Sequence, residues 1–121
     1  MDVAIDFVIR SATAADPDTL RTYAERRLAF ALRRFEHRAR RVLVRLGDTN
    51  GPRRGVDSRC AITLQLRDGR YIDVEAVTAW PFASITLAAK RLNEVLRREL
   101  EKAQRSVRRR HRSGFDAPAG A

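Results

Sequence analysis

The sequence is poor in the residues that build disulfides, metal sites and catalytic sites. It contains one cysteine and two histidines in 121 residues. One cysteine cannot close an internal disulfide, and neither His37 nor His111 has a second ligand nearby that would suggest zinc. No nucleophile is paired with a base at a suggestive spacing. We therefore expect no catalytic residue, no metal, no cofactor and no small-molecule substrate.

Cys60 falls on the apolar side of a predicted strand. A cysteine in such a position is expected to be a small buried hydrophobe, with a reactive or regulatory thiol as the alternative.

Long apolar runs are also absent. No stretch approaches the ~18 residues that a membrane-spanning helix needs. The first ten residues include acids and lack the apolar core of a signal peptide. We expect a cytoplasmic protein in a reducing compartment, with no membrane partner.

Charge of one sign is in excess. Lys and Arg number 25 against 15 Asp and Glu, which gives a formal net charge of +10. Most of these cations are arginines, whose planar guanidinium group pairs well with phosphate. The apolar content of 44% is enough for a core, so the charge belongs to a folded domain rather than to a disordered tail. A polyanionic partner follows from this balance.

The hydrophobic periodicity predicts four strands and two helices. Apolar residues at every second position mark the strands, and apolar residues three or four apart mark the helices. Asp16-Pro17 is typical of a helix start, and Asp68-Gly69 is typical of a two-residue hairpin turn. In chain order, the predicted elements cover residues 3–9, 17–37, 41–47, 60–67, 71–78 and 82–110.

The order β-α-β-β-β-α predicts the fold. A β-α-β crossover followed by an antiparallel meander places both helices on one face of a four-stranded mixed sheet, giving a two-layer α/β (α+β) sandwich. We expect one domain over residues 1–110 and a flexible tail over 111–121. Glu99 interrupts the apolar face of the second helix, so that helix is expected to leave the domain there and project into solvent.

The arginines on the second helix suggest a binding surface. Counted at about 100° per residue, five cations fall in one band beside the apolar face. This band would track a phosphate backbone, although basic residues that only solvate the helices through salt bridges are the alternative. The five cations are Arg91, Arg98, Lys102, Arg105 and Arg109.

The first helix adds to this basic surface. Arg26 and Arg33 share its outward side, and Arg40 and Arg41 begin the next strand. The open face of the sheet is expected to be less basic, because it receives acids from the fourth strand. The helical layer is therefore the predicted binding face.

Tyr23 and Phe30 are also predicted on the outward side of the first helix. An aromatic ring there gains nothing from the core of the domain. Bases of a nucleic acid could stack on both rings, and burial under a loop or a protein partner is the alternative.

Three motifs together resemble the ribosome hibernation-promoting factor and ribosome-associated inhibitor family, over roughly residues 3–110. The third motif resembles a proteobacterial branch of that family. The motifs are LxxYxxxRLxxxLxxF over 20–35, FAxIxxxxxRLxxxL over 82–96, and LGDxNGPRxGxDxRC over 46–60.

The resemblance implies a protein that occupies the small-subunit channel used by messenger RNA and transfer RNA. Such a protein inhibits translation by occlusion and contacts ribosomal RNA through its basic helical face. It is expected to be monomeric when free. The matched positions carry over Arg26, Arg27, Arg91, Arg98 and Lys102 as ribosomal-RNA contacts.

Two other interpretations stay open at this point. The chain could be a structured-RNA binder that acts away from ribosomes, since two-layer domains also bind RNA by shape. It could instead be a protein-interaction module in which Tyr23 and Phe30 dock a partner.

Overall fold

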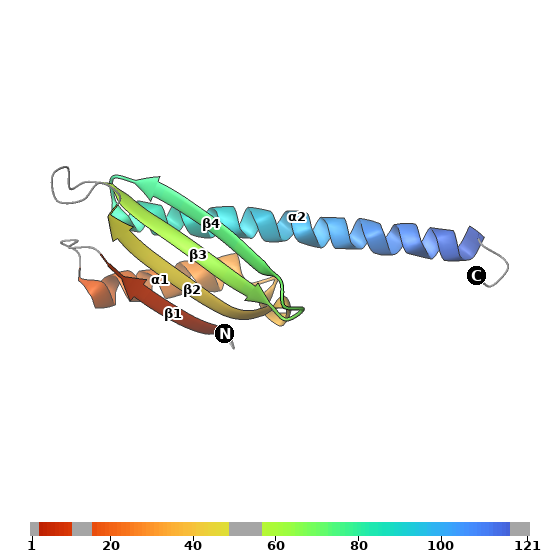
Figure 1. Cartoon of the computed structure of the whole chain (residues 1–121), viewed down its shortest axis with the longest axis horizontal. Coiled ribbons are helices and arrows are strands. Elements are labelled where there is room, and N and C mark those ends of the chain that lie inside the picture. Colours follow the sequence, from red (N-terminus) through yellow and green to blue (C-terminus); the bar gives the residue numbers. More distant parts are fainter. Residues whose placement is uncertain (1–2, 11–15, 49–56, 117–121) are drawn as a thin grey trace.

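The computed structural model describes residues 3–10, 16–48 and 57–116, with side chains described up to Arg109. Residues 49–56, in the segment expected to connect the strands over 41–47 and 60–67, lie outside these residues. The helices and strands follow the predicted order (Figure 1). They are β1 (Ala4–Ile9), α1 (Pro17–Ala31), the 3₁₀ turn η1 (Glu36–Arg38), β2 (Ala39–Asp48), β3 (Ser58–Leu66), β4 (Tyr71–Thr78) and α2 (Pro81–Asp116).

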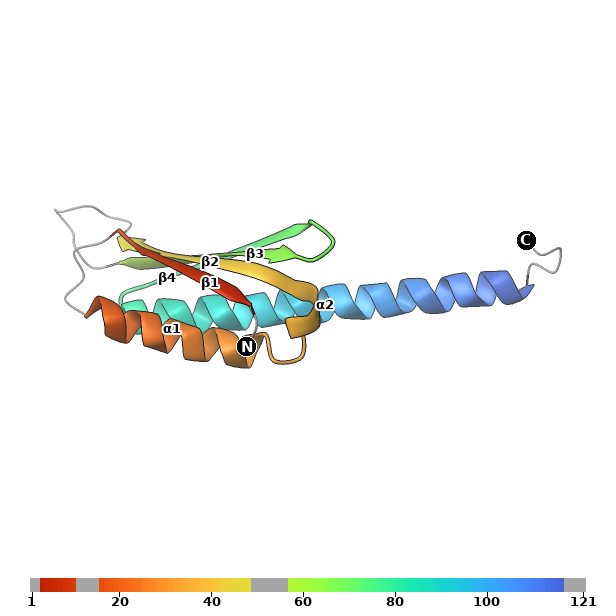
Figure 2. The ribbon, with the colours of Figure 1, turned by 90° about the horizontal axis from the view of Figure 1, so that it is seen from below.

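The four strands form one mixed sheet in the order β1-β2-β3-β4. β1 and β2 are parallel because α1 carries the chain back across the sheet between them, whereas β2, β3 and β4 form an antiparallel meander. Both helices cover the same face of the sheet (Figure 2). The predicted two-layer α+β sandwich is confirmed.

The core lies between the sheet and the two helices. Alternate residues of each strand point into it, so Val42, Val44 and Leu46 of β2 are buried while Arg41 and Arg45 are exposed on the opposite face. The largest fully buried side chains come from β2, β3, both helices and the turn that follows α1. They are Leu20, Leu28, Leu32, Phe35, Val42, Val44, Leu46, Ile62, Leu64, Ile85, Leu92 and Leu96.

The start of α1 matches the prediction, but its end does not. Asp16 caps the helix, and its side chain accepts a hydrogen bond from the backbone N–H of Thr19 at 3.0 Å. The helix ends at Ala31 rather than near residue 37. Leu32 and Phe35 are still buried, but they lie in a turn that brings the chain back to β2. Their apolar spacing therefore continued past the true end of the helix.

The turn between β3 and β4 is one residue longer than predicted. Leu66 and Arg70 are joined by a backbone hydrogen bond of 2.8 Å, so Arg67, Asp68 and Gly69 form the loop. Gly69 has a φ of 92°, the left-handed conformation that glycine adopts without strain. A three-residue hairpin with glycine at this position is a common alternative to the two-residue turn.

α2 is anchored to the sheet near its first turn. The buried hydroxyl of Ser84 donates to the carbonyl oxygen of Ser58 on β3 at 2.7 Å, and it bonds the hydroxyl of Thr78 on β4 at 2.7 Å. These bonds satisfy a buried polar group and fix the start of the helix against two strands.

The far half of α2 projects beyond the sheet, as Figure 1 shows. Among the described side chains, up to Arg109, the last polar contact of α2 with the sheet region is an ion pair of 3.2 Å between Glu99 and Arg70, which follows the β3–β4 turn. Val107 continues the apolar side of the helix but is 53% exposed. The predicted projection after Glu99 is confirmed. The helix continues to Asp116, beyond the end expected near residue 110, because residues 108–114 contain no apolar side chain that could have marked helical spacing. The division into a domain over 1–110 and a tail over 111–121 stays a prediction.

In the part of the chain that the structure describes, no helix combines the length and apolarity needed to cross a membrane.

Leu92→Ala is expected to lower the free energy of unfolding by about 2–5 kcal/mol, because it opens a cavity where α2 meets the sheet. Val107→Ala on the same helix should change it by less than about 0.5 kcal/mol, since that side chain is half in solvent. Urea unfolding followed by circular dichroism measures both. Similar losses for the two variants would contradict the projecting helix.

Cys60 is buried in the core on β3, as predicted. Burial raises the pKa of its thiol to about 12 from an ordinary value of 9.0. The folded protein therefore retains a proton that the unfolded chain releases above pH 9. The contribution of this thiol to stability is complete below pH 9 and is lost as the pH rises toward 12.

Between pH 8 and pH 10, the free energy of unfolding of the wild type should fall by about 1.4 kcal/mol more than that of Cys60→Ala. All other side chains are the same in both proteins, so their effects cancel in the comparison. Urea unfolding at the two pH values tests this. Equal pH dependence, or rapid reaction of the folded protein with a thiol reagent at pH 8, would contradict a buried thiol.

Candidate nucleic-acid interface

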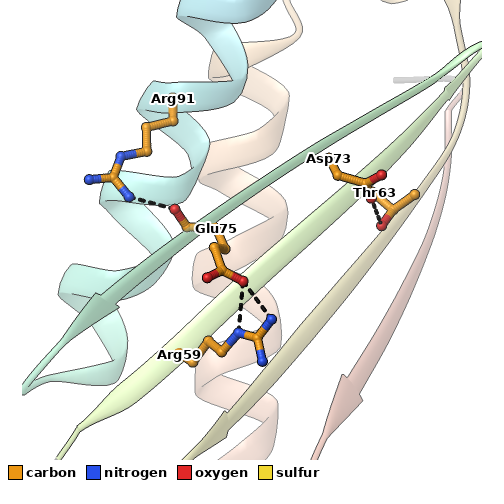
Figure 3. A network of polar contacts seen from close by, with 5 residues as sticks. All are labelled: Arg59, Thr63, Asp73, Glu75 and Arg91. Atoms are coloured by element: carbon orange, nitrogen blue, oxygen red, sulfur yellow. Dashed lines mark hydrogen bonds and ion pairs between the residues drawn. The ribbon is translucent and has the colours of Figure 1, made fainter. Parts of the chain in front are cut away.

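The open face of the sheet carries charges of both signs that largely pair with one another. Arg41 bonds Asp6 at 2.8 Å, and Arg59 bonds the carboxylate of Glu75. Figure 3 shows the second pair. Ion pairs across neighbouring strands leave little free positive charge on this face, which agrees with the prediction that it is the less basic of the two.

The helical layer carries cations that are not paired. In residues 16–48 and 81–109, only one ion pair joins residues a turn apart on a helix, between Arg21 and Glu25 at 3.9 Å. The interpretation that the basic residues only solvate the helices through such pairs is therefore not supported. The exposed cations on or next to the helices that form no ion pair with a described residue are Arg26, Arg33, Arg34, Lys90, Arg91, Arg97, Arg98, Lys102, Arg105, Arg108 and Arg109.

α2 has two flanks that face different elements. On one flank, Arg91 donates through Nη1 to the backbone carbonyl oxygen of Glu75 on β4 at 2.5 Å (Figure 3). On the other flank, Asn93 donates to the carbonyl oxygen of Ala31 in α1 at 2.8 Å. We call these the β4 flank and the α1 flank.

The predicted basic band runs along the β4 flank. Arg98 and Lys102 follow Arg91 at spacings of 7 and 11 residues, which keep them on the same side of a helix. In the folded body of the domain, this band is therefore separated from the cations of α1 by the body of α2. Lys102, Arg105 and Arg109 lie on the segment of α2 that projects beyond the sheet.

Three predicted contacts lie outside the surface of α1. Arg41 belongs to the open sheet face, where it is paired with Asp6, so its assignment to the helical layer is wrong. Arg40 lies at a register shift of β2 between Ala39 and Arg41. Arg33 follows the end of α1 and lies in the turn, where it is exposed. Arg33 lies in the turn because the helix ends earlier than the apolar pattern suggested. Arg41 lies on the open face because successive residues of a strand point to opposite faces and its neighbour Val42 is in the core.

The predicted outward position of Tyr23 is wrong. Its hydroxyl bonds the hydroxyl of Thr86 on α2 at 2.6 Å, and its ring packs edge-on against Phe82, with centroids 5.1 Å apart. Tyr23 is thus half-buried between the two helices. The direct contact with α2 explains why an aromatic ring on this side of α1 is not in solvent.

Arg27 is oriented by the same contacts. Its Nε donates to the hydroxyl of Tyr23 at 3.2 Å and to that of Thr86 at 3.4 Å, and its guanidinium carbon lies 5.6 Å from the Tyr23 ring centroid. The hydrogen bond with Thr86 and the positive charge of Arg27 lower the pKa of Tyr23 against the opposing effect of desolvation. Arg27, which the family resemblance proposed as an RNA contact, is therefore held at the junction of α1 and α2.

A groove of about 240 Å³ lies between the helices next to this junction. Phe30 borders it and is 72% exposed, so its predicted exposure is confirmed. The remaining residues that line the groove are Arg27, Ala31, Thr86, Ala89, Lys90 and Asn93.

Sequence reasoning missed Lys90, Arg97 and Asn93. Lys90 lies four residues after Thr86 and three before Asn93, so the same helical spacing that defined the β4 flank also defines this side. Counting along α2 could have found a second band of cations. It could not have shown which of the two bands faces α1.

Within residues 3–10, 16–48 and 57–109, no group of three or more His, Cys, Asp or Glu residues is placed to hold a metal ion.

Comparison with known proteins places these features in a family. The family described as "Sigma 54 modulation protein / S30EA ribosomal protein" matches residues 7–104. The crystal structure of the N-terminal domain of Protein Y from Thermus thermophilus is similar, with a TM-score of 0.62 and 25% sequence identity over 79% of this chain and 98% of that one.

A second similar structure is that of a ribosomal subunit interface protein from Coxiella burnetii. Its TM-score is 0.64 at 14% identity, over 82% of this chain and 99% of that one, which is a likeness of fold. No curated protein sequence matches this chain.

Tyr23→Phe and Thr86→Val should each destabilise the protein, and their effects should not add. The shared hydrogen bond predicts a coupling energy of about 0.5–1.5 kcal/mol in a double-mutant cycle measured by urea unfolding. Tyr71→Phe, which removes an exposed hydroxyl on β4, should be additive with Thr86→Val. A coupling of zero between Tyr23 and Thr86 would show that this hydrogen bond does not join the helices.

Proposed function

Because this chain belongs to the sigma 54 modulation protein / S30EA ribosomal protein family, we propose that it is a ribosome-associated inhibitor of translation. It binds the small ribosomal subunit, contacts ribosomal RNA through its helical layer, and occupies the channel used by messenger RNA and transfer RNA. This mode of action is the one that the family resemblance implies.

The observation that carries the proposal is the unequal distribution of unpaired charge. The exposed cations of the helical layer form few ion pairs, whereas two arginines of the open sheet face, Arg41 and Arg59, pair with Asp6 and Glu75. Unpaired arginines and lysines are available to replace the counterions that surround a phosphate backbone. The helical layer is therefore the side that would meet RNA.

Occlusion of a channel does not require the protein to catalyse a reaction. A channel is blocked by a rigid body of suitable shape that binds its wall, and no bond of a substrate has to be broken. The sheet, packed under two helices, supplies such a body, and unpaired cations supply the attachment. We propose a non-enzymatic role without a cofactor, in the cytoplasm, for a protein that is monomeric when free.

The two flanks of α2 suggest a division of the contacts. On the α1 flank, Lys90 shares the groove with Arg27, and Arg97 follows Lys90 at a spacing of seven residues, so these cations would form a compact patch over the folded body. The β4 flank continues along the projecting helix with Lys102, Arg105 and Arg109. We propose that this projecting helix reaches a second stretch of RNA that the folded body does not cover.

Co-sedimentation with small ribosomal subunits through sucrose tests the proposal. Wild-type protein should bind, and binding should weaken steeply as salt rises, because each phosphate contact releases counterions. The triple variant Arg91→Glu/Arg98→Glu/Lys102→Glu should bind at least about tenfold more weakly at moderate salt, with a smaller salt dependence.

The matched control reverses three exposed arginines outside the helical layer, Arg10→Glu/Arg45→Glu/Arg67→Glu. It carries the same change of net charge and should bind nearly as well as the wild type. Equal loss in both triple variants would show that total charge rather than the helical face governs binding. Retention of naked duplex RNA without binding to subunits would favour a general structured-RNA binder.

A further inference from the structure

We propose that the groove between α1 and α2 is a stacking site for one unpaired nucleobase, with Phe30 as the stacking surface and Arg27 and Lys90 as ligands of the adjoining phosphates. This inference rests on the proposed function, because it specifies how the helical layer would hold RNA. It adds a contact with a base to the contacts between cations and phosphates on which the proposed function rests.

Phe30 contributes little to the core, so the fold does not explain why an aromatic ring occupies this position. It lies in the last turn of α1 and is 72% exposed, while the nearby Leu28 and Ala31 are buried. Within the described chain, no ring pairs with it, although Tyr23, Phe82 and Trp80 pack near one another. Covering a purely apolar ring with a flat apolar surface lowers the free energy, because both surfaces leave water. A nucleobase offers such a surface regardless of its identity.

Arg27 is prepared to bind an anion beside this ring. Its Nε is engaged by the hydroxyls of Tyr23 and Thr86, which fix the orientation of the guanidinium plane. Its two terminal amino groups have no hydrogen-bond partner among the described residues. A guanidinium held at Nε and open at its ends can give two parallel hydrogen bonds to a phosphate with little further loss of side-chain entropy.

Lys90 and Asn93 complete the groove from the side of α2. Lys90 is exposed and forms no ion pair with a described residue, so its charge is available to a second phosphate. Asn93 is anchored by donating to the carbonyl oxygen of Ala31, and its own side-chain oxygen has no partner within the described chain. That oxygen is an acceptor directed by an anchored amide, and it fits the N–H groups on the edge of a base.

The charges favour a nucleotide over an apolar protein segment. A hydrophobic side chain of a protein would cover Phe30 but would leave Arg27 and Lys90 to lose water without compensation. A nucleotide brings an apolar face and a phosphate within one unit. An exposed aromatic ring between unpaired cations is the arrangement that single-stranded RNA binders use.

The test compares two RNA probes that have the same number of phosphates. One is a fluorescent hexamer with bases, and the other is the matching abasic hexamer; binding is followed by anisotropy at low salt. Phe30→Ala should weaken binding of the hexamer with bases roughly 5- to 150-fold, as expected for the loss of one stacked base, and should leave binding of the abasic hexamer unchanged. Phe30→Tyr should restore binding, because it returns an aromatic ring.

Two controls separate the site from its surroundings. Tyr71→Ala removes another exposed aromatic, on β4, and should leave both probes unaffected. Lys90→Gln should weaken binding of both probes to a similar degree, because it removes only a phosphate contact. Circular dichroism checks that each variant is folded. We expect all of them to fold, because the substituted side chains are exposed.

Three results would overturn the assignment. The first is that Phe30→Ala weakens binding of the two probes equally, and the second is that it changes binding of neither probe. The third is that Phe30→Ala abolishes binding to ribosomal subunits while its affinity for both hexamers equals that of the wild type. The last of these would place a protein rather than a base on Phe30. If wild-type protein fails to bind small subunits but still distinguishes the two probes, the proposed function fails and the nucleobase site stands.

Discussion

The arrangement of this protein depends on the burial of one face of a four-stranded sheet. Val42, Val44 and Ile62 point to the same side of the sheet, and both helices must cover that side to remove these residues from water. The opposite face needs no cover, because it carries charges of both signs that pair across strands. Most of the unpaired positive charge then lies on the outer surface of the helices.

The contact between the two helices turns this charge into a specific surface. Tyr23, Thr86 and Arg27 form one hydrogen-bonded group at the contact, and Asn93 bonds the end of α1. These contacts bring the cations of α1 next to those of the α1 flank of α2. They also hold Arg27 in one orientation beside an exposed ring, which a flexible surface arginine would not keep. Helix packing thereby prepares the groove for the nucleotide that we propose.

The projecting half of α2 shows the limit of what the core can hold. Beyond Glu99 the apolar side of the helix no longer meets the sheet, and Val107 is largely in solvent. Closely spaced cations along a free helix repel one another and oppose helix formation. A polyanion would remove this repulsion, so binding and helix stability should be linked in this segment. A contact made by this segment would extend the footprint of the protein without enlarging its core.

Much of the fold was predictable from local patterns, because alternation of apolar residues and turn-forming pairs are read directly along the chain. The order of elements, the bounds of β4, the placement of both helices on one face and the exposure of Phe30 followed in this way. The end of α1 did not, because Leu32 and Phe35 keep helical spacing while lying in a buried turn.

Composition and periodicity determined that the chain is basic, that it forms a two-layer α+β domain and that its charge lies mainly on the helices. Only the tertiary structure decided that Tyr23 is enclosed, that Arg41 is paired on the other face and that Lys90 rather than Arg91 adjoins α1. The physical reason is that periodicity gives the angle of a side chain about its own helix, whereas its neighbours depend on how the whole helix is rotated and packed against the rest of the core.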